Sequence, residues 1–330
     1  MQEPKVYVIV LNWNRPDETC ASLESLLGLV YPNYRIILCD NASAPATVLS
    51  IRQWAAGRRP DSREVFFREI HVRHPGADDS GPSARITLIH TGENLGFAGG
   101  MNVGLRHAMA KGDADYCWIL NNDTVVAPDA LNALVARAQR DDRIGICGST
   151  LVNYFDRERV RAYGGARYAS WCARSSAIGA FSHIDSVPAD PAAVERQMSY
   201  VLGASMLVSS RFLRETGLMD ESYFLYSEEH DWAYRGMKQG FRLGYAPDSL
   251  VYHIEGATIG TSASGGSELS LFYLYRSKAM FAARHHAWLL PSAIASFLWD
   301  ATKMAIKGRI RKSLAIVRGV LAWPSRRAFD

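Results

Sequence analysis

The chain has 330 residues, of which 48% are hydrophobic and 21% are charged. This is the composition of an ordinary globular protein with one large domain or two smaller ones, and it excludes a disordered chain. The five cysteines lie far apart without a Cys-x-x-Cys pair, which argues against a disulfide scaffold and indicates reduced thiols in a cytoplasmic protein. The first residues enter a strand pattern directly, so we expect no signal peptide.

Strand and helix patterns alternate along the first 150 residues. Runs typical of strands cover residues 5–12, 34–40, 84–90, 115–120 and 144–152, with a further short strand expected at 64–70. Runs typical of helices cover residues 18–30, 46–56, 97–111 and 128–140. This alternation predicts an α/β fold with a mainly parallel central sheet and helices on both faces. In such sheets, ligands bind at the carboxyl ends of the strands.

The second half of the chain is less regular. Residues 154–200 indicate loops with short antiparallel strands, and the apolar run 200–209 predicts a strand. A helix is expected over 227–239, where Gly240 ends it, and a further strand over 241–253.

Polar residues follow the main strands of the first half of the chain. They are Asn12, Asn14, Asp40, the segment 91–94 and the run Asn121, Asn122 and Asp123. Ordinary turn chemistry explains one such strand end, because Asn and Asp tolerate turn conformations. Four in succession, at the rim where this fold places ligands, predict a binding site.

The segment GENLGFAGGMNVG (92–104) follows a strand and opens a helix. Its glycines allow backbone N–H groups to approach an anion at the helix N-terminus. Their spacing differs from the dinucleotide-binding fingerprint, which also belongs after the first strand, so a dehydrogenase is disfavoured. Close packing of the helix on the sheet through small residues is the alternative role for these glycines.

The stretch YSEEHDWAYRG (226–236) is the densest acidic cluster. As a helix start, it would use Ser227 as the cap, and Glu228 and Glu229 would favour the positive end of the helix dipole. The flanking aromatic residues also desolvate these acids, which raises a carboxyl pKa and suits the group to accept a proton. On helical geometry Glu228 and Asp231 share a face, whereas Glu229 points about a quarter-turn away.

Asp123 is a single carboxylate, which is a poor site for a divalent cation unless distant residues add ligands. His253 ends a strand that follows the acidic helix, and this position makes it a candidate, although a lone histidine is more often structural. The spacing of histidines and acids fits no compact zinc motif.

The C-terminal tail is strongly basic, because residues 301–330 hold eight Lys and Arg against one acid. The apolar run 287–299 is shorter than the roughly 20 residues that a membrane-spanning helix needs. A basic amphipathic helix of this kind is suited to lie on an anionic membrane surface. Packing on the catalytic domain and a contact in a homo-oligomer are the alternatives, and no nucleic-acid-binding motif accompanies the charge.

A set of ordered motifs, from about residue 5 to residue 286, makes the chain similar to a known family. The motifs are VIVLNWNRPDETCASLESLL, ILCDNAS, ENLGFAGGMNVG, WILNNDTVV, FLYSEEHDWAYRGMKQGFRLGYAPDSLVYH and LFYLYRSKAMFAARHH. In this order they resemble the inverting glycosyltransferases of family 2, in particular the bacterial rhamnosyltransferase-like branch. The resemblance implies a GT-A fold for residues 1–265, with a nucleotide-binding half (1–125) and an acceptor-binding half (126–265). Residues 266–330 would form a helical, basic and amphipathic extension.

The resemblance also implies roles for the matching positions. The base and ribose of a dTDP- or UDP-sugar donor would be held by Leu11, Asn12, Asn14 and Asp40. The nucleotide and sugar pocket would include Asn94, Gly96, Gly100 and Asn102. The Asp-x-Asp site of the family falls on Asn121, Asn122 and Asp123, so Asp123 and His253 would bind Mg²⁺ or Mn²⁺ at the diphosphate. The acceptor side would include Gly203, Ala204 and Trp232.

The catalytic-base position of the family falls on Glu229, with Glu228 and Asp231 as alternatives. Glu229 replaces the usual Asp of the Glu-Asp-x-Asp pattern, which adds one methylene of reach. Asn121 replaces the first acid of Asp-x-Asp, which puts the affinity for a metal in question.

The activity implied is transfer of a sugar to a hydroxyl of a glycan or lipid-linked acceptor in cell-surface polysaccharide synthesis. The leading donor is dTDP-L-rhamnose, and UDP-galactofuranose, UDP-GlcNAc and other UDP-hexoses are alternatives. The alternative of a different class is an inactive nucleotide-sugar-binding module, although the presence of Glu229, Asp123 and His253 argues against it. The expected setting is cytoplasmic, at the inner face of the plasma membrane, without nucleic acid as a partner.

Overall fold

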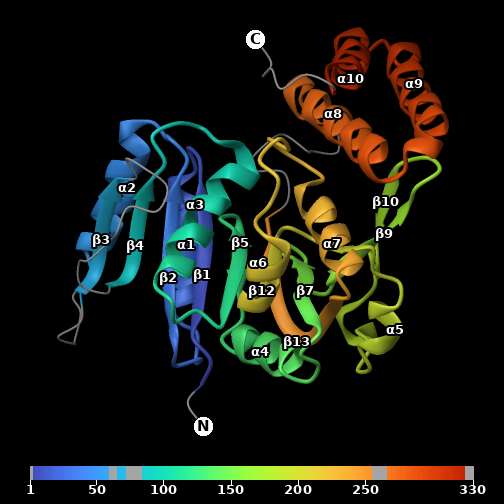
Figure 1. Ribbon diagram of the computed structural model, residues 1–330. Coiled ribbons are helices and arrows are strands. Elements are labelled where there is room, and N and C mark those ends of the chain that lie inside the picture. Colours follow the sequence, from blue (N-terminus) through green and yellow to red (C-terminus); the bar gives the residue numbers. More distant parts are fainter. Residues whose placement is uncertain (1–2, 59–64, 72–83, 255–265, 324–330) are drawn as a thin grey trace.

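The computed structural model describes residues 3–58, 65–71, 84–254 and 266–323 (Figure 1). Within them the chain forms a large mixed sheet, a small three-stranded sheet and a group of C-terminal helices. The domain boundary expected at residue 265 lies outside the described residues, as do residue 64 of the short strand and the last seven residues of the basic tail.

Ten strands of the described chain form the central sheet. Its main path runs β3 (Val65–His71), β4 (Ala84–His90), β2 (Tyr34–Asp40), β1 (Val6–Asn12), β5 (Tyr116–Asn121), β12 (Ser205–Ser209), β7 (Ile144–Asn153), β13 (Arg242–His253) and β6 (Thr124–Val126), and β8 (Val160–Tyr163) pairs with β7. The strands from β3 to β5 are parallel, whereas β12 is antiparallel to both of its neighbours. The mainly parallel sheet predicted from the alternation is confirmed.

Helices cover both faces of the sheet, because successive strand residues point to opposite sides. On one face, Val6, Val8 and Val10 of β1 belong to a buried cluster that includes residues of α1 (Pro16–Leu27), α2 (Pro45–Ala56) and α4 (Ala130–Ala138). On the other face, Tyr7 and Ile9 belong to a cluster with residues of α3 (Gly96–Ala110), α6 (Ser210–Thr216) and α7 (Glu228–Lys238). The predicted two-sided covering is therefore confirmed.

The strand predicted over 200–209 is wrong in one respect, because it is divided between two sheets. Its first part is β11 (Tyr200–Val201), which pairs with β9 (Gly165–Ala169) in the small sheet, beside β10 (Arg174–Ala177). Its second part is β12, which pairs with β5 and β7. Both parts are buried and apolar, so the sequence pattern carries no sign of the change of sheet.

The segment between β8 and β11 contains the short antiparallel strands that were expected for residues 154–200, together with a 3-10 turn (Ile184–Ser186) and the short helix α5 (Ala192–Glu195). The strand β8, which is antiparallel to β7, also lies in that expected range, whereas the strand β6 and the helix α6 were not predicted as separate elements.

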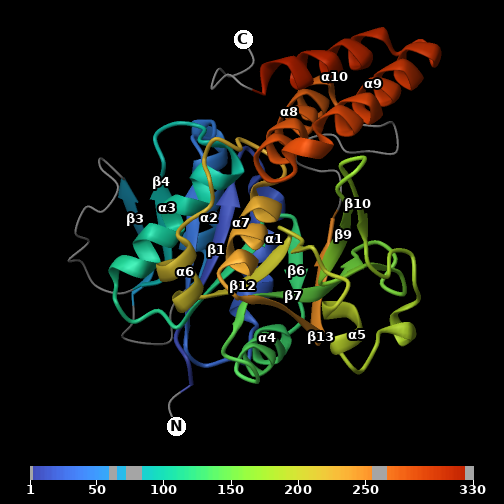
Figure 2. The ribbon, with the colours of Figure 1, turned by 45° about the vertical axis from the view of Figure 1, so that its right-hand side comes forward.

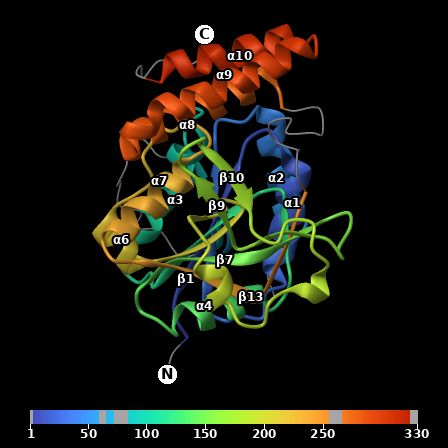
Figure 3. The same ribbon diagram turned by 90° about the vertical axis from the view of Figure 1, so that its right-hand side faces the viewer.

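Three long helices, α8 (Glu268–His285), α9 (Leu290–Ile306) and α10 (Ile310–Ala322), form the helical extension, with a 3-10 turn (Ala287–Leu289) between α8 and α9. Figures 1, 2 and 3 show them together at the end of the molecule opposite the start of β1, close to the hairpin of β9 and β10. They share a buried cluster that includes Tyr275, Phe297 and Ile316. No helix within the described residues has the length and apolar composition needed to cross a bilayer.

Helix α3 lies close against β1 and β2 through glycines. A Cβ atom at Gly104 would lie 2.5 Å from Ile9 Cγ2 and 3.0 Å from Cys39 Sγ, and one at Gly100 would collide with Leu11. The expected packing through small residues is therefore present. This close approach sets the position of the start of α3, which carries the segment of Asn94 and Gly96.

We expect Gly104→Val to destabilise the protein. Overpacking of a core costs about 1–3 kcal/mol, which exceeds the roughly 0.5 kcal/mol that helix propensity would return. Urea unfolding should give a lower midpoint than for the wild type. The matched control is Gly57→Val, since a Cβ atom there meets only atoms at 3.6 Å or more. Equal midpoints for the two variants would contradict the close packing.

Candidate active site

The ends of β1, β2 and β5 are connected by buried hydrogen bonds. Asn122 Nδ2 donates to Thr19 Oγ1 at 2.9 Å, and Thr19 Oγ1 donates to Asn12 Oδ1 at 2.9 Å. Asn12 Nδ2 in turn donates to Asp40 Oδ1 at 2.8 Å. All four side chains are buried. Asn12 and Asn122 therefore act by holding the strand ends, and with them Asp40 and Asp123, in place.

Asp40 is kept ionised by its neighbours. Burial alone would raise the pKa of its carboxyl, but the nearby His90 and hydrogen bonds from Ser43 and Asn12 outweigh burial and hold the pKa below its usual value. His90 Nε2 lies 3.0 Å from Glu69 Oε2, and His90 Nδ1 lies 3.9 Å from Asp40 Oδ2. A fixed carboxylate of this kind accepts hydrogen bonds from hydroxyl groups such as those of a ribose. Sequence analysis did not single out Ser43 or His90.

The turns that follow β1 and β2 are joined by hydrogen bonds. Asn14 and Ala42 both have left-handed backbone conformations, with φ values of 53° and 59°. Asn14 Oδ1 accepts a hydrogen bond from Ala44 N at 2.7 Å, and Asn14 N donates to Ser43 Oγ at 2.9 Å. Asn14 thus fixes the rim beside Asp40 in a conformation that few residue types adopt without strain.

The start of α3 is fixed to the loop that precedes the acidic helix. Asn94 Oδ1 accepts from Gly96 N at 3.0 Å and from Asn41 Nδ2 at 2.9 Å. Gly96 has φ +70°, and a Cβ atom there would collide with Phe224 O, while Phe97 N donates to the same carbonyl at 2.8 Å. The glycine is needed for this close contact between the start of α3 and the loop before the acidic helix.

Two residues expected in binding pockets have structural roles instead. Asn102 is completely buried, and its amide bonds Met219 O, Met219 N and Glu221 Oε1. Trp232 is also completely buried, with its indole N–H donating to Gly217 O at 2.8 Å and its ring against Phe212. Neither side chain has exposed surface here, so the assignments of Asn102 to the sugar pocket and of Trp232 to the acceptor side stay predictions that these contacts do not support.

Asp123 and His253 are brought together by strand pairing. In the antiparallel pair of β13 and β6, His253 is opposite Thr124, and Ile254 N donates to Asp123 O at 2.9 Å. His253 Nε2 lies 3.2 Å from Asp123 Oδ1. Asp123 is only 5% exposed, and its Oδ1 has no hydrogen-bond partner.

This arrangement suits a divalent cation. A buried carboxylate oxygen without a hydrogen-bond partner, beside an imidazole nitrogen, is a donor pair that Mn²⁺ accepts. The described residues contain no cluster of three or more His, Cys, Asp or Glu that would hold a metal by themselves. Arg161 of β8 adds positive charge near Asp123: burial lowers its pKa and the Asp123 carboxylate opposes that effect.

The first turn of α7 holds two buried carboxyl groups side by side. Glu228 Oε2 and Glu229 Oε2 both lack a hydrogen-bond partner. Burial raises the pKa of Glu229 to about 7, and burial together with the charge of Glu229 raises the pKa of Glu228 well above its usual value. A carboxyl that titrates near neutral pH is suited to accept a proton in a reaction.

Glu229 lines a cavity of about 200 Å³ between α7, α8 and the small sheet. The other lining residues are Tyr168, Ser175, Tyr200, Tyr226, Ser227, His230, Leu274, Lys278 and Phe281. Burial lowers the pKa of His230 to about 3, so this imidazole is neutral at physiological pH. Glu229 is thus the member of the acidic cluster that reaches a cavity, and the polar groups that line this cavity with it are hydroxyl groups, one neutral imidazole and one ammonium.

The helix start differs from the expected one. Ser227 does not cap α7 with its side chain, and instead Ser227 O accepts from Asp231 N at 2.9 Å. Tyr226 and Ser227 both have left-handed backbone conformations, with φ values of 68° and 67°. Two such residues in succession store strain, which is a frequent property of functional sites. The strained turn directs Glu228 and Glu229 into the interior.

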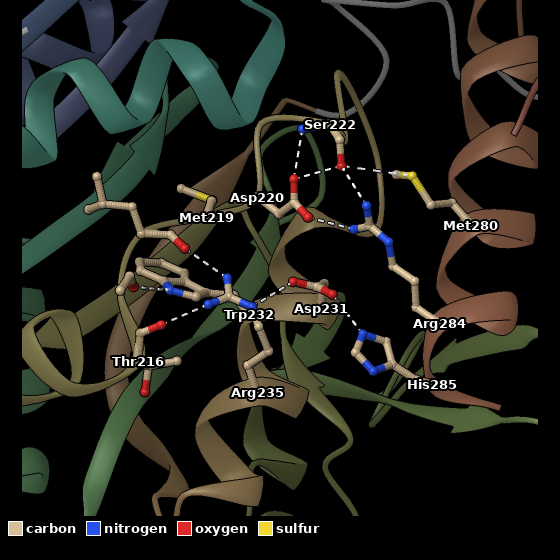
Figure 4. Close-up of polar contacts among 12 residues, drawn as sticks. Thr216, Met219, Asp220, Ser222, Asp231, Trp232, Arg235, Met280, Arg284 and His285 are labelled. Carbon is tan, nitrogen blue, oxygen red and sulfur yellow. Dashed lines mark hydrogen bonds and ion pairs between the residues drawn. The ribbon is translucent and has the colours of Figure 1, made fainter. Parts of the chain in front are cut away.

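Asp231 has a different environment and is fully paired (Figure 4). His285 Nε2 of α8 lies 2.7 Å from Asp231 Oδ1, and Arg235 Nε donates to Asp231 Oδ2 at 2.8 Å. Arg235 also donates to the carbonyls of Thr216 and Leu218. Burial would raise the pKa of Asp231, but these partners outweigh it and lower the pKa. The structure therefore favours Glu229 or Glu228 over Asp231 as the proton acceptor, and gives Asp231 the role of joining α7 to α8.

The acceptor-side residues Gly203 and Ala204 lie in the turn between β11 and β12. Ala204 O accepts from Asn121 N at 3.2 Å, so this turn is bonded directly to the Asp-x-Asp segment. Sequence analysis missed the cavity residues Tyr168, Ser175 and Lys278. The motif LFYLYRSKAMFAARHH contains Lys278 and His285, but it also contains Arg276, Ser277 and Arg284, so it does not single them out.

Comparisons with known proteins agree on a family. The model of the family "Glycosyl transferase family 2" matches residues 7–171. The putative glycosyltransferase EpsE of Bacillus subtilis is 26% identical over 251 residues, which is 76% of this chain and 73% of that protein. The N-acetylglucosaminyl-diphospho-decaprenol L-rhamnosyltransferase of Mycobacterium tuberculosis is 25% identical over 278 residues, which is 74% of this chain and 86% of that protein.

Solved structures agree on the fold. The mannosyltransferase PcManGT of Pyrobaculum calidifontis, in complex with GDP-Man and Mn²⁺, superposes with a TM-score of 0.56 at 17% identity, covering 99% of this chain and 89% of that one. GalNAc-T7 with UDP, GalNAc and Mn²⁺ gives a TM-score of 0.55 at 16% identity, covering 83% of this chain and 47% of that one. The chain has the GT-A fold and belongs to glycosyl transferase family 2.

Proposed function

We propose that this glycosyltransferase moves a sugar from a nucleotide-diphospho-sugar to an acceptor hydroxyl with inversion of configuration, and that Glu229 is the base. The observation that carries the proposal is the Glu229 carboxyl, which lines a cavity of about 200 Å³ and has a pKa raised to about 7 by burial. An acceptor hydroxyl has too high a pKa to attack unaided at neutral pH. A nearby carboxylate that takes its proton during the attack lowers this barrier.

In this proposal the nucleotide diphosphate leaves from the face opposite to the attack, and Glu229 keeps the proton. The adjacent Glu228 is held protonated by burial and by the charge of Glu229, so the pair carries a single negative charge before the reaction. Asp231, paired with His285 and Arg235, keeps the helix that carries Glu229 in place.

The donor diphosphate is proposed to lie at Asp123 and His253, in the segment that takes the place of Asp-x-Asp. A divalent cation bound there, with Mn²⁺ or Mg²⁺ as candidates, would neutralise charge on the leaving diphosphate. Asp123 and His253 would hold it, and diphosphate oxygens would complete its ligands. Arg161, beside Asp123, adds a fixed positive charge at the same place. Asp40 and the turn of Asn14 are proposed to hold the nucleoside.

The leading donor is dTDP-L-rhamnose, with the similarity to the mycobacterial rhamnosyltransferase as its support. UDP-galactofuranose, UDP-GlcNAc and other UDP-hexoses remain alternatives within the same fold. The acceptor is proposed to be a saccharide on a lipid diphosphate, by analogy with the substrate in the name of that relative.

Contact with an anionic membrane surface is proposed for the C-terminal helices, at the inner face of the plasma membrane. Large apolar side chains are exposed there, among them Trp288 (80%), Ile306 (77%) and Leu321 (74%). Exposed basic residues, including Arg311 and Arg318, alternate with them on α10. Basic and apolar residues together bind the interface of anionic bilayers.

We expect Glu229→Gln to abolish most sugar transfer while donor binding persists. The amide keeps the shape of the side chain and cannot accept the proton. In the wild type, kcat/KM should rise as the pH increases through about 7, because the reactive form of Glu229 is the deprotonated one and its pKa is about 7. Transfer assays and donor thermal shifts measure the two properties. Glu268→Gln, an exposed acid at the start of α8, is the control. Normal turnover in Glu229→Gln would refute the assignment of the base.

We expect Asp123→Ala to remove the Mn²⁺ dependence of donor binding. The variant loses the carboxylate that would bridge the cation to the protein, so nucleotide-sugar should raise Tm equally with and without Mn²⁺. In the wild type Mn²⁺ should increase the shift, since a tighter ligand stabilises the native state more. Asp129→Ala, which removes an exposed acid nearby in sequence, should behave as the wild type. An unchanged Mn²⁺ effect in Asp123→Ala would exclude Asp123 from the site.

A further inference from the structure

A second cavity, of about 350 Å³, lies between β10 and the helices α8 and α9. Its lining includes more cations than anions. The residues are Arg174, Ser175, Tyr275, Lys278, Asp300, Lys303, Met304 and Lys307. Four basic side chains therefore face one carboxylate, and the cavity carries an excess of positive charge at neutral pH.

Asp300 neutralises only part of this positive charge. Arg174 Nη2 lies 2.7 Å and Lys303 Nζ lies 2.6 Å from Asp300 Oδ1. Tyr275 donates its hydroxyl to the other oxygen, Asp300 Oδ2, at 2.9 Å. Both oxygens of the only acid in the lining are thus in use.

Lys278 and Lys307 have no such partner. Among the ion pairs of the described residues, neither lysine is matched with a carboxylate. Lys278 is half-buried and lies over the ring of Tyr275, with Nζ 5.2 Å from the ring centroid. Burial lowers the pKa of Lys278, and the nearby Arg174 lowers it further, while Asp300 opposes both. A bound anion would relieve the repulsion among these cations and replace the water that Lys278 loses.

This basic cavity adjoins the cavity of Glu229. Ser175 and Lys278 line both of them. A molecule with a hydroxyl at Glu229 and an anionic group on its far side would therefore occupy the two cavities together. The donor diphosphate has its own proposed position at Asp123 and His253, where β13 pairs with β6, and neither residue lines the basic cavity.

The outer side of the same helices is apolar. Leu298, Trp299 and Ile306 of α9 are exposed, and Ile306 is next to Lys307 in the chain. The basic cavity thus shares residues with the cavity of Glu229, and α9, which lines the basic cavity, also carries exposed apolar residues. This succession matches a molecule that consists of a sugar, an anionic linker and a lipid.

We propose that the basic cavity binds the phosphate or diphosphate group through which the acceptor sugar is attached to its lipid. Lys278 contacts the part of the linker nearest the sugar, and Lys303 and Lys307 contact the part nearest the lipid. This inference rests on the proposed function, since it assigns an acceptor to the cavity of Glu229. Charge-assisted hydrogen bonds to phosphate oxygens are the chemistry involved.

The same chemistry occurs in the headgroups of bulk anionic phospholipids. The acceptor linker fits better, because Asp300 is only 16% exposed and Lys278 is half-buried, so both are recessed from a flat bilayer surface. Contact with headgroups of a bilayer needs no recessed cavity, because exposed basic residues such as Arg318 can bind them at the surface.

The test compares two acceptors in non-ionic detergent micelles without phospholipid. One is N-acetylglucosamine on a short polyprenyl diphosphate, and the other is the same sugar on an uncharged alkyl chain. The wild type should have the higher kcat/KM with the diphosphate acceptor. Lys303→Gln/Lys307→Gln should reduce this preference by roughly tenfold or more, since a hydrogen bond to a charged group contributes about 1.5–3 kcal/mol and 1.4 kcal/mol is tenfold. Arg318→Gln removes an exposed charge outside the cavity and should keep the preference.

The results separate this inference from the proposed function. If the wild type uses both acceptors equally, or if the double variant keeps the preference, the anion site is refuted and the transferase function stands. If the wild type transfers sugar to neither, the proposed function fails and the inference fails with it. If the double variant loses preference only after anionic vesicles are added, the cavity binds bulk headgroups and the inference is refuted. Lys307→Gln alone, at an exposed position that ends α9, gives the same comparison if the double variant does not fold.

Discussion

The ion pair between Asp231 and His285 joins the two helices on which the proposed chemistry depends. Asp231 lies in the first turn of α7, two residues after Glu229, and His285 is the last residue of α8. Arg235 holds the other carboxylate oxygen and anchors it to two backbone carbonyls. Together with the ring contact of His230 and Phe281, this pairing holds α8 against α7, and both helices line the Glu229 cavity.

Hydrogen-bond partners then determine how the pKa values of the three buried acids of α7 differ. The three carboxyl groups are close in sequence, yet Asp231 has a lowered pKa and Glu228 and Glu229 have raised ones. The difference comes from partners, because both oxygens of Asp231 are bound, by Arg235 and His285, whereas one oxygen of each glutamate has no hydrogen-bond partner. Pairs of acids whose environments separate their pKa values are typical of sites that move protons. The helical extension therefore contributes lining residues to the proposed active site, through α8, and also carries the proposed membrane surface.

Much of the fold was predictable, because burial of alternate strand residues leaves a local pattern in the sequence. The clustering of Asn12, Asp40 and Asn122 was also predictable, since parallel strands bring their carboxyl ends to one edge. The approach of His253 to Asp123 depends on the pairing of β13 with β6, and only the family resemblance indicated it. Long-range contacts also decide the burial of Trp232, which the resemblance placed on the acceptor side and which packs on Phe212 of α6. The basic cavity is formed by three separate elements, β10, α8 and α9. The hydrophobic periodicity of a sequence does not indicate which distant elements come together, so this cavity was not predicted.

The most direct test of a single displacement assisted by Glu229 is the anomeric configuration of the product. A nucleotide-sugar that raises Tm, with dTDP-L-rhamnose as the first choice, would be incubated with acceptor and Mn²⁺, and the transferred sugar followed by proton NMR from the first turnovers. Attack by the acceptor hydroxyl opposite the leaving diphosphate predicts a product of inverted anomeric configuration. A product with the configuration of the donor would contradict this mechanism and the role of Glu229 as its base.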